Sequence, residues 1–254
     1  MKTQFDKIYV LSLITNKERQ KFITYQFNQL GLEFEFVYGI DFYNFKNIEW
    51  PDVLKYTEWH GGGTSEDFGC TMTHYQAVMQ AYHLGYNNVL IFEDDVCLNK
   101  DISVFEDMLN NIPENIDFID YDPRLCFQED QQQLIECINN SNERYLNLDD
   151  FPFRGAAMFA IMNRDTMKLY LDNQHKCFKM SDNVNGFFET YEGKRTINYY
   201  IPSKCLFVDQ SAYSKVFIEH DHAFYSGYDN VYLRINNYTG DNFFKPFYFH
   251  LFSK

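Results

Sequence analysis

The sequence lacks the features that would place it in a membrane or bind it to nucleic acid. No apolar run in its 254 residues approaches the roughly 20 residues of a membrane-spanning helix. The formal net charge is −14 at pH 7, and no local cluster of lysine and arginine offsets it. A protein with this charge repels nucleic acid and anionic membrane surfaces. We therefore expect no nucleic-acid partner and no membrane span.

Paired cysteine motifs are also missing. The six cysteines are spread singly through the chain, with no Cys-x-x-Cys pair, at Cys70, Cys97, Cys126, Cys137, Cys177 and Cys205. A chain of this length can bury a full core without disulfide bonds. The apolar run at residues 8–14 is interrupted by Ser12 and is too short for a secretory signal peptide. These features predict free thiols and a cytoplasmic location, with at most a peripheral contact to a membrane surface.

A glycine-rich phosphate loop is absent as well. The three glycines at 61–63 are not followed by the Lys-Ser or Lys-Thr that ends a P-loop, which disfavours a phosphotransferase or nucleotidyltransferase. What is present is apolar surface, because 45% of the residues are hydrophobic and 19% are aromatic. That composition excludes a disordered chain.

Hydrophobic patterning predicts strands that alternate with helices. Residues 8–13 predict a strand, and residues 15–30 an amphipathic helix that begins at a Thr15–Glu18 capping box and stops at Gly31. A second strand at 34–37 completes a unit whose two strands run parallel. A helix over 64–84, with a stripe of large apolar residues, then leads to a strand at 88–92. The stripe consists of Phe68, Met72, Tyr75, Met79 and Tyr82.

The rest of the chain continues the alternation. Helices are expected at 101–111 and 163–171, and strands at 116–121, 156–161, 196–201 and 205–208. The polar stretch at 128–142 fits either a surface helix or a mobile loop. No repeat or linker divides the chain, so the fold class is α/β, with one domain over residues 1–254 and an irregular C-terminal region.

Three consecutive acidic residues follow the predicted strand at 88–92. In open α/β sheets, ligands bind at the carboxyl ends of the strands, where Glu93, Asp94 and Asp95 are expected to lie. Alternation along an extended chain would put Glu93 and Asp95 on one side and Asp94 on the other. Two such oxygen donors suit Mg²⁺ or Mn²⁺, which could neutralise a diphosphate in this acidic protein. The alternative is that these acids cap a helix or form a solvated turn.

Three sequence blocks carry a resemblance to a known family. The first is Val-Leu-Ser-Leu at 10–13 with Arg19, followed by 34–41. The second runs from Asp-Phe-Gly-Cys-Thr-Met-Thr-His at 67–74 to Leu-Ile-Phe-Glu-Asp-Asp-Val at 90–96, and the third covers 155–171, Asp182 and 202–214. Together they resemble glycosyltransferase family 25, which contains lipopolysaccharide galactosyltransferases and collagen hydroxylysine galactosyltransferases. Thr73 stands where the family usually has serine, and the family's proline-rich lead-in before Asp182 is missing.

The resemblance implies a GT-A-like mixed sheet flanked by helices and a UDP-hexose donor. In that reading, residues 1–125 form the nucleotide-sugar-binding half and residues 126–254 the acceptor half. The implied donor-binding residues are Ser12, Leu13, Arg19, Gly69, Cys70, His74 and Asp94. Structural roles compete with this reading: an exposed helix charge at Arg19, a relaxed helix start at Gly69, and a buried structural histidine at His74.

The resemblance also suggests how the reaction would run. Asp95 would hold the metal with help from Glu93 or Asp94. His220 and His222 would add imidazole ligands from a C-terminal segment, unless they belong to a solvated loop. Asp182 would be the general base of an inverting transfer, unless it merely caps the helix that follows. The acceptor would be a glycan or hydroxylysine in a collagen-like protein. The alternative is an inactive glycan- or protein-binding module on the same scaffold.

Overall fold

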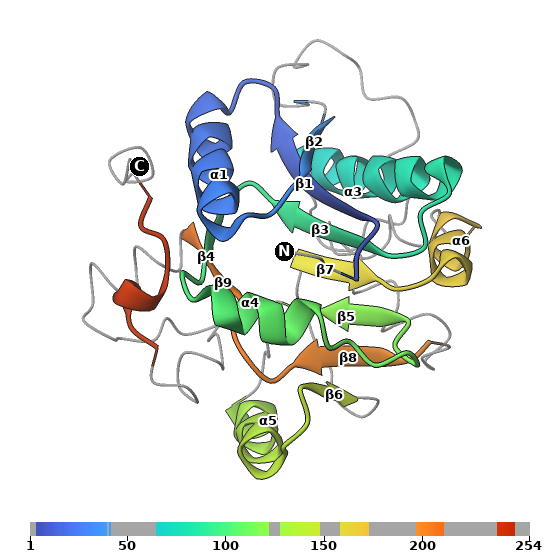
Figure 1. Cartoon of the computed structure of the whole chain (residues 1–254). Helices are drawn as coiled ribbons and strands as arrows, with labels where there is room; N and C mark the ends of the chain where they lie inside the picture. The colour runs from blue at the N-terminus through green and yellow to red at the C-terminus, as the bar shows by residue number, and fades with distance from the viewer. Residues whose placement is uncertain are drawn as a thin grey trace.

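The chain folds around one mixed β-sheet. The computed structural model describes residues 4–39, 41, 65–121, 128–147, 158–172, 197–210 and 238–246. Seven strands form a sheet in the order β2-β1-β3-β7-β5-β8-β6 (Figure 1). They are β1 (Lys7–Leu13), β2 (Glu35–Gly39), β3 (Val89–Glu93), β5 (Phe118–Asp120), β6 (Tyr145–Asn147), β7 (Met158–Ile161) and β8 (Tyr199–Pro202). Two further strands, β4 (Val96–Leu98) and β9 (Phe207–Asp209), pair antiparallel beside it.

Helices flank the sheet. The described helices are α1 (Lys17–Leu30), α3 (Ser65–Leu84), α4 (Ile102–Leu109), α5 (Gln128–Asn140) and α6 (Arg164–Asp172), with a short 3₁₀ turn at Gly240–Asn242. This arrangement confirms the predicted α/β fold class with a mixed sheet. Within the described residues, no helix combines the length and apolar character needed to cross a lipid bilayer.

Strand direction decides where the functional edge lies. Strand β1 pairs parallel with both β2 and β3, which confirms the predicted parallel unit. Strand β7 runs antiparallel between β3 and β5, and β8 runs parallel to β5. Strands β1, β2, β3, β5 and β8 therefore all end at the same edge of the sheet.

Helix α1 largely follows its sequence pattern. The predicted apolar residues Phe22, Ile23, Phe27 and Leu30 are all buried, and Gly31 ends the helix in a left-handed conformation with φ of 63°. The predicted capping box does not form. The helix starts after Asn16, which makes no side-chain cap, and Glu18 instead pairs with Lys21 at 2.6 Å.

Helix α3 buries a different face from the one predicted. Among the stripe residues, Met72, Tyr75, Met79 and Tyr82 are only partly buried. The fully covered positions are smaller or polar: Thr71, His74, Ala77, Val78 and Ala81. The helix packs on β1, β2 and β3, and small side chains allow the close approach that large aromatic residues would prevent.

The approach is tightest where β2 ends. A Cβ atom on Gly39 would overlap the hydroxyl of Thr73 on α3. Glycine is therefore required here because there is no space for a Cβ atom. Its backbone is not in the left-handed region, so the backbone conformation alone does not require glycine.

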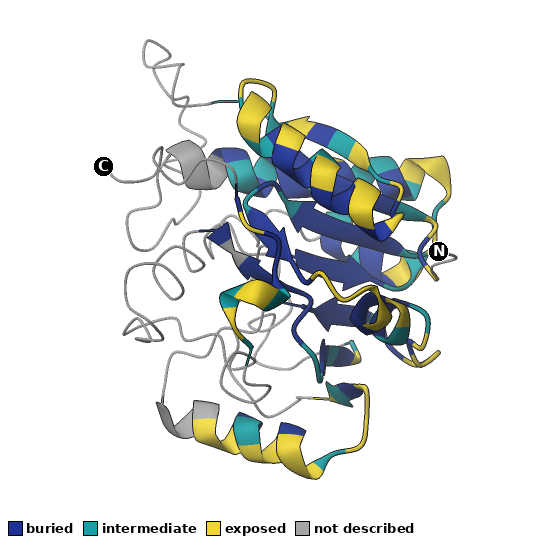
Figure 2. Ribbon diagram, turned by 60° about the vertical axis from the view of Figure 1, so that its left-hand side comes forward, coloured by how far each residue is buried: buried dark blue, intermediate teal, exposed yellow. Residues whose placement is uncertain are grey.

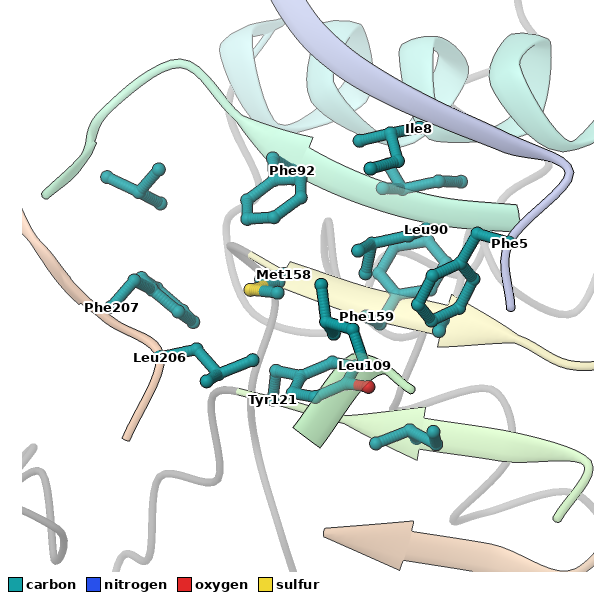
Figure 3. Packing of buried hydrophobic residues seen from close by; sticks show 14 of the residues in the cluster. Phe5, Ile8, Leu90, Phe92, Leu109, Tyr121, Met158, Phe159, Leu206 and Phe207 are labelled. Atoms are coloured by element: carbon teal, nitrogen blue, oxygen red, sulfur yellow. The ribbon is translucent and has the colours of Figure 1, made fainter. Parts of the chain in front are cut away.

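The core lies between the sheet and its helices. Figure 3 shows Phe92 from β3 and Met158 and Phe159 from β7 converging with Leu206 and Phe207 from the β9 segment. Each such side chain contributes about 1.5–3 kcal/mol when fully buried. The stretch at 128–142, for which two alternatives were open, contains helix α5 over Gln128–Asn140, whose outer face is exposed (Figure 2). Leu134 and Ile138 are its buried contacts with the rest of the protein.

Candidate functional site

The edge at which β1, β2 and β3 end carries a cavity of about 210 Å³. The end of β1, the first turn of α1, the end of β2, the start of α3 and the acidic turn after β3 all contribute to its wall. The lining residues are Leu11, Ser12, Leu13, Asn16, Arg19, Gly39, Asp41, Gly69, Cys70, Thr73, Glu93, Asp94 and Asp95. The acidic triplet thus lies at the carboxyl edge of the sheet, as its sequence position predicts.

Asp94 is the buried member of the triplet. Its side chain is only 7% exposed. One carboxylate oxygen accepts hydrogen bonds from the Ser12 hydroxyl at 2.6 Å and from the Asn16 amide at 3.3 Å. The other accepts from Arg19 Nη1 at 3.0 Å. Asp94 therefore connects the turn after β3 to the end of β1 and the start of α1.

Arg19 lies between two members of the triplet. Its Nη1 atom is 3.0 Å from Asp94 and 3.7 Å from Asp95, and its side chain is 28% exposed. The residue is therefore fixed in the cavity wall, whereas an ordinary helix-surface charge would extend into solvent. Gln20, one residue later, donates to the Leu13 carbonyl at 2.7 Å and to the Ser12 hydroxyl at 3.2 Å, which holds the β1 end in place.

Glu93 faces the opposite wall, formed by α3. Its Oε1 atom accepts from the Cys70 thiol at 3.3 Å and lies 3.4 Å from Nε2 of His74. His74 is fully buried, and its ring stacks on Phe159 of β7. Gly69 also lines the cavity, and its carbonyl accepts a hydrogen bond from Thr73 at 2.7 Å.

The side chains of the triplet do not follow strand alternation. Strand β3 ends at Glu93, and Asp94 and Asp95 form the turn that leads into β4. Arg19 consequently reaches both aspartates, while Glu93 points toward α3. The expected pairing of Glu93 with Asp95 on one side of an extended chain differs from this arrangement, because a turn rotates successive side chains differently from a strand.

The cavity is acidic. Of the described residues that line it, Asp41, Glu93, Asp94 and Asp95 carry carboxylates, and Arg19 carries the positive charge. A bound diphosphate would be repelled by this surplus, so a divalent cation is the simplest means of accommodating it. Within the described part of the chain, Cys70, His74 and Glu93 form a group whose ligand atoms could hold a metal ion.

The structure brings together most of the residues expected from the sequence. Ser12, Leu13, Arg19, Gly69, Cys70 and the triplet all line one cavity, and His74 lies directly behind its wall. Three expected residues, Asp182, His220 and His222, lie outside the described residues.

Sequence reasoning missed several residues of this cavity. Asn16, Gly39 and Asp41 line it without having been singled out, and Gln20 supports it from behind. The sequence could have indicated Asn16 by its position in the first loop, between the end of β1 and Arg19. Asp41 follows directly after the expected second strand, at the same edge as the acidic triplet.

Comparison with known proteins supports the resemblance seen in the motifs. The sequence model described as "Glycosyltransferase family 25 (LPS biosynthesis protein)" matches residues 5–201, which is more than half of the chain. Among solved structures, the chain is similar to a glycosyltransferase involved in the glycosylation of the major capsid of PBCV-1, with 11% sequence identity and a TM-score of 0.32. That match covers 68% of this chain and 66% of the other. Because the TM-score is low, we draw no conclusion about fold or function from this match. No protein with a curated description matches the sequence.

Proposed function

The chain belongs to glycosyltransferase family 25, and from that membership we propose that it transfers a hexose from a UDP-sugar to a hydroxyl group. The hexose would be galactose or glucose, and the acceptor a glycan or hydroxylysine in a collagen-like protein. The observation that carries this proposal is the acidic turn at the carboxyl edge of the sheet, facing a cavity whose wall also holds Arg19.

The two aspartates of the turn are suited to different tasks. Both oxygens of Asp94 already accept hydrogen bonds, so its role is to hold the cavity wall and Arg19 in position. The Asp95 side chain is 24% exposed and lines the cavity. Asp95 therefore offers a hard oxygen donor of the kind that Mn²⁺ or Mg²⁺ prefers, and Glu93 offers another from the α3 side of the cavity. His220 and His222 remain proposed as further ligands.

These residues fit a divalent cation by the chemistry of their donors. A bound cation would neutralise the charge that develops on the departing UDP. The protein itself would supply the remaining functions. Arg19 would contact the ribose or the diphosphate, and the Ser12–Leu13 segment the uridine. Gly69, without a side chain, would allow close approach of the donor to the backbone.

The transfer itself would be a single displacement. The acceptor oxygen would bond to the anomeric carbon as the bond from that carbon to the UDP oxygen breaks, with inversion. The acceptor proton would pass to the carboxylate of Asp182, acting as general base. Asp182 is proposed from the family resemblance alone, because it lies outside the described residues.

The decisive measurement is release of UDP from a panel of UDP-hexoses, with Mn²⁺ and with a chelator. Asp95→Ala should lower metal-dependent release by about 10²-fold or more, since it removes a ligand from the leaving-group side. Asp172→Ala on α6 is the matched control, because its carboxylate is exposed and pairs only locally with Lys168 among the described residues. Full activity in Asp95→Ala would refute the metal assignment, and no UDP release from any donor would favour a binding module.

A further inference from the structure

Three side chains with metal-binding chemistry meet at the wall of the cavity that α3 forms. Cys70 and His74 lie one turn apart on α3, and Glu93 ends β3. The thiol sulfur, a ring nitrogen and a carboxylate oxygen all lie within 4.8 Å of one another. This combination of sulfur, nitrogen and oxygen differs from the all-oxygen set that Mg²⁺ or Mn²⁺ prefers.

The contacts of His74 indicate which ring nitrogen faces Glu93. Its Nδ1 atom is 3.0 Å from the Cys70 carbonyl oxygen and 3.5 Å from the Cys70 thiol sulfur. A carbonyl oxygen can only accept, so the shorter contact is a hydrogen bond when Nδ1 carries the hydrogen. In a neutral ring, Nε2 then directs a lone pair toward the Glu93 carboxylate, 3.4 Å away. Two lone pairs repel at that distance, and either a proton or a metal ion between them relieves the repulsion. Metal-binding histidines in proteins commonly show this pattern, with the second ring nitrogen donating to a backbone carbonyl.

The separations between the three residues match a known coordination geometry. Around a tetrahedral zinc ion, sulfur and oxygen ligands lie about 3.5 Å apart, and nitrogen and oxygen ligands about 3.4 Å apart. Here Cys70 Sγ lies 3.3 Å and His74 Nε2 lies 3.4 Å from the same oxygen of Glu93. The thiol sulfur, a ring nitrogen of His74 and a carboxylate oxygen all lie within 4.8 Å of one another.

We propose that Cys70, His74 and Glu93 form a binding site for a zinc-class transition-metal ion. Thiolate and imidazole favour zinc over manganese or magnesium, so the site would be chemically distinct from the hard-cation site at Asp95. Cys70 and Glu93 also line the cavity, so an ion that they held would lie at its wall. Zinc binding would withdraw Glu93 from the hard-cation site and place a second ion beside the donor, which would inhibit transfer.

Cobalt titration tests the site directly, without any sugar substrate. Co²⁺ replaces zinc in such sites, and binding through sulfur gives a thiolate-to-metal charge-transfer band together with the visible bands of tetrahedral cobalt. The wild-type protein should bind Co²⁺ with the thiolate band, and Zn²⁺ should displace it. Cys70→Ser should abolish the band. Cys137→Ser should retain it, since Cys137 is an exposed cysteine on α5.

A second measurement needs only the wild-type protein. A zinc concentration about ten times the dissociation constant should slow alkylation of Cys70 about tenfold, because roughly nine-tenths of the sites would be occupied. Peptide mass spectrometry reads Cys137 in the same sample as the internal control, which should react at an unchanged rate. Absence of both the thiolate band and the protection would overturn the proposal and leave a proton between His74 and Glu93. Neither readout depends on glycosyl transfer, so each proposal can fail separately.

Discussion

Replacing Asp94 by asparagine should destabilise the protein far more than the same change at its neighbour Asp95. Asp94 accepts hydrogen bonds from Ser12, Asn16 and Arg19 and is almost fully buried. An amide in its place keeps one acceptor but directs its NH₂ group toward other donors. Asp95 contacts the same arginine at 3.7 Å from a partly exposed position.

The cost can be worked out from these contacts. A hydrogen bond to a charged group contributes about 1.5–3 kcal/mol, which we reduce to about 1–1.5 because Arg19 is partly exposed and retains Asp95. Loss of the hydrogen bond from the buried Ser12 hydroxyl costs about 0.5–1 kcal/mol more, since this hydroxyl can still donate to the Leu13 carbonyl at 3.2 Å. We expect Asp94→Asn to lower the free energy of unfolding by about 2 kcal/mol. The melting temperature should fall by about 4–8 °C.

Thermal and urea unfolding in the presence of a chelator provide the assay, because metal binding would otherwise add to stability. Asp95→Asn should cost less than about 0.5 kcal/mol under the same conditions, as expected for a partly exposed pair. The reasoning would be refuted if both variants lost equal stability, or if Asp95→Asn lost more.

Three further predictions concern other parts of the molecule. Gly39→Ala should lower the free energy of unfolding by about 1–3 kcal/mol by forcing a methyl group against Thr73, and the loss should shrink in a Thr73→Ala background when measured by urea unfolding. Burial raises the pKa of Asp107, but hydrogen bonds from Arg144 and Lys204 outweigh it, so the pKa lies below its ordinary value. Asp107→Asn should therefore be less stable than wild type at pH 7, by less than about 1 kcal/mol, with the gap closing as urea unfolding is repeated below about pH 4. Asp182→Asn should slow transfer by about 10²–10⁴-fold while leaving UDP binding, measured by calorimetry, unchanged.

The helices and strands that can be predicted from the sequence are those whose apolar residues are regularly spaced. Helix α1 and the parallel strands around it follow from their apolar spacing, and Gly31 ends the helix as expected. Strand β4 was not predicted, and it follows directly after the acidic turn. The amide of Gln26 on α1 holds it, accepting from Leu98 at 2.6 Å and donating to Val96 at 3.0 Å. Such a tertiary contact leaves no signal in the local sequence.

The candidate site shows the same division. The acidic triplet was identifiable because it follows a buried strand, and the position of that strand in the sheet determines the edge it reaches. The roles of the three carboxylates were not identifiable, because they depend on a turn and on partners such as Ser12, which is 82 residues distant from Asp94 in sequence. The buried face of α3, which consists of small residues, was likewise not identified, because the large apolar residues on another face form the clearer helical pattern.

The placement of β7 has a consequence for how the protein is synthesised. Strand β3 pairs on one side with β1 and on the other with β7, and β5 pairs with β7 and β8. As the chain leaves the ribosome, β5 and one edge of β3 thus have no partner in this sheet until residues 158–161 emerge. A fragment ending near residue 125 would expose these strand edges, which are prone to intermolecular pairing. The first half of the chain therefore depends on a strand supplied by the later half to complete its sheet.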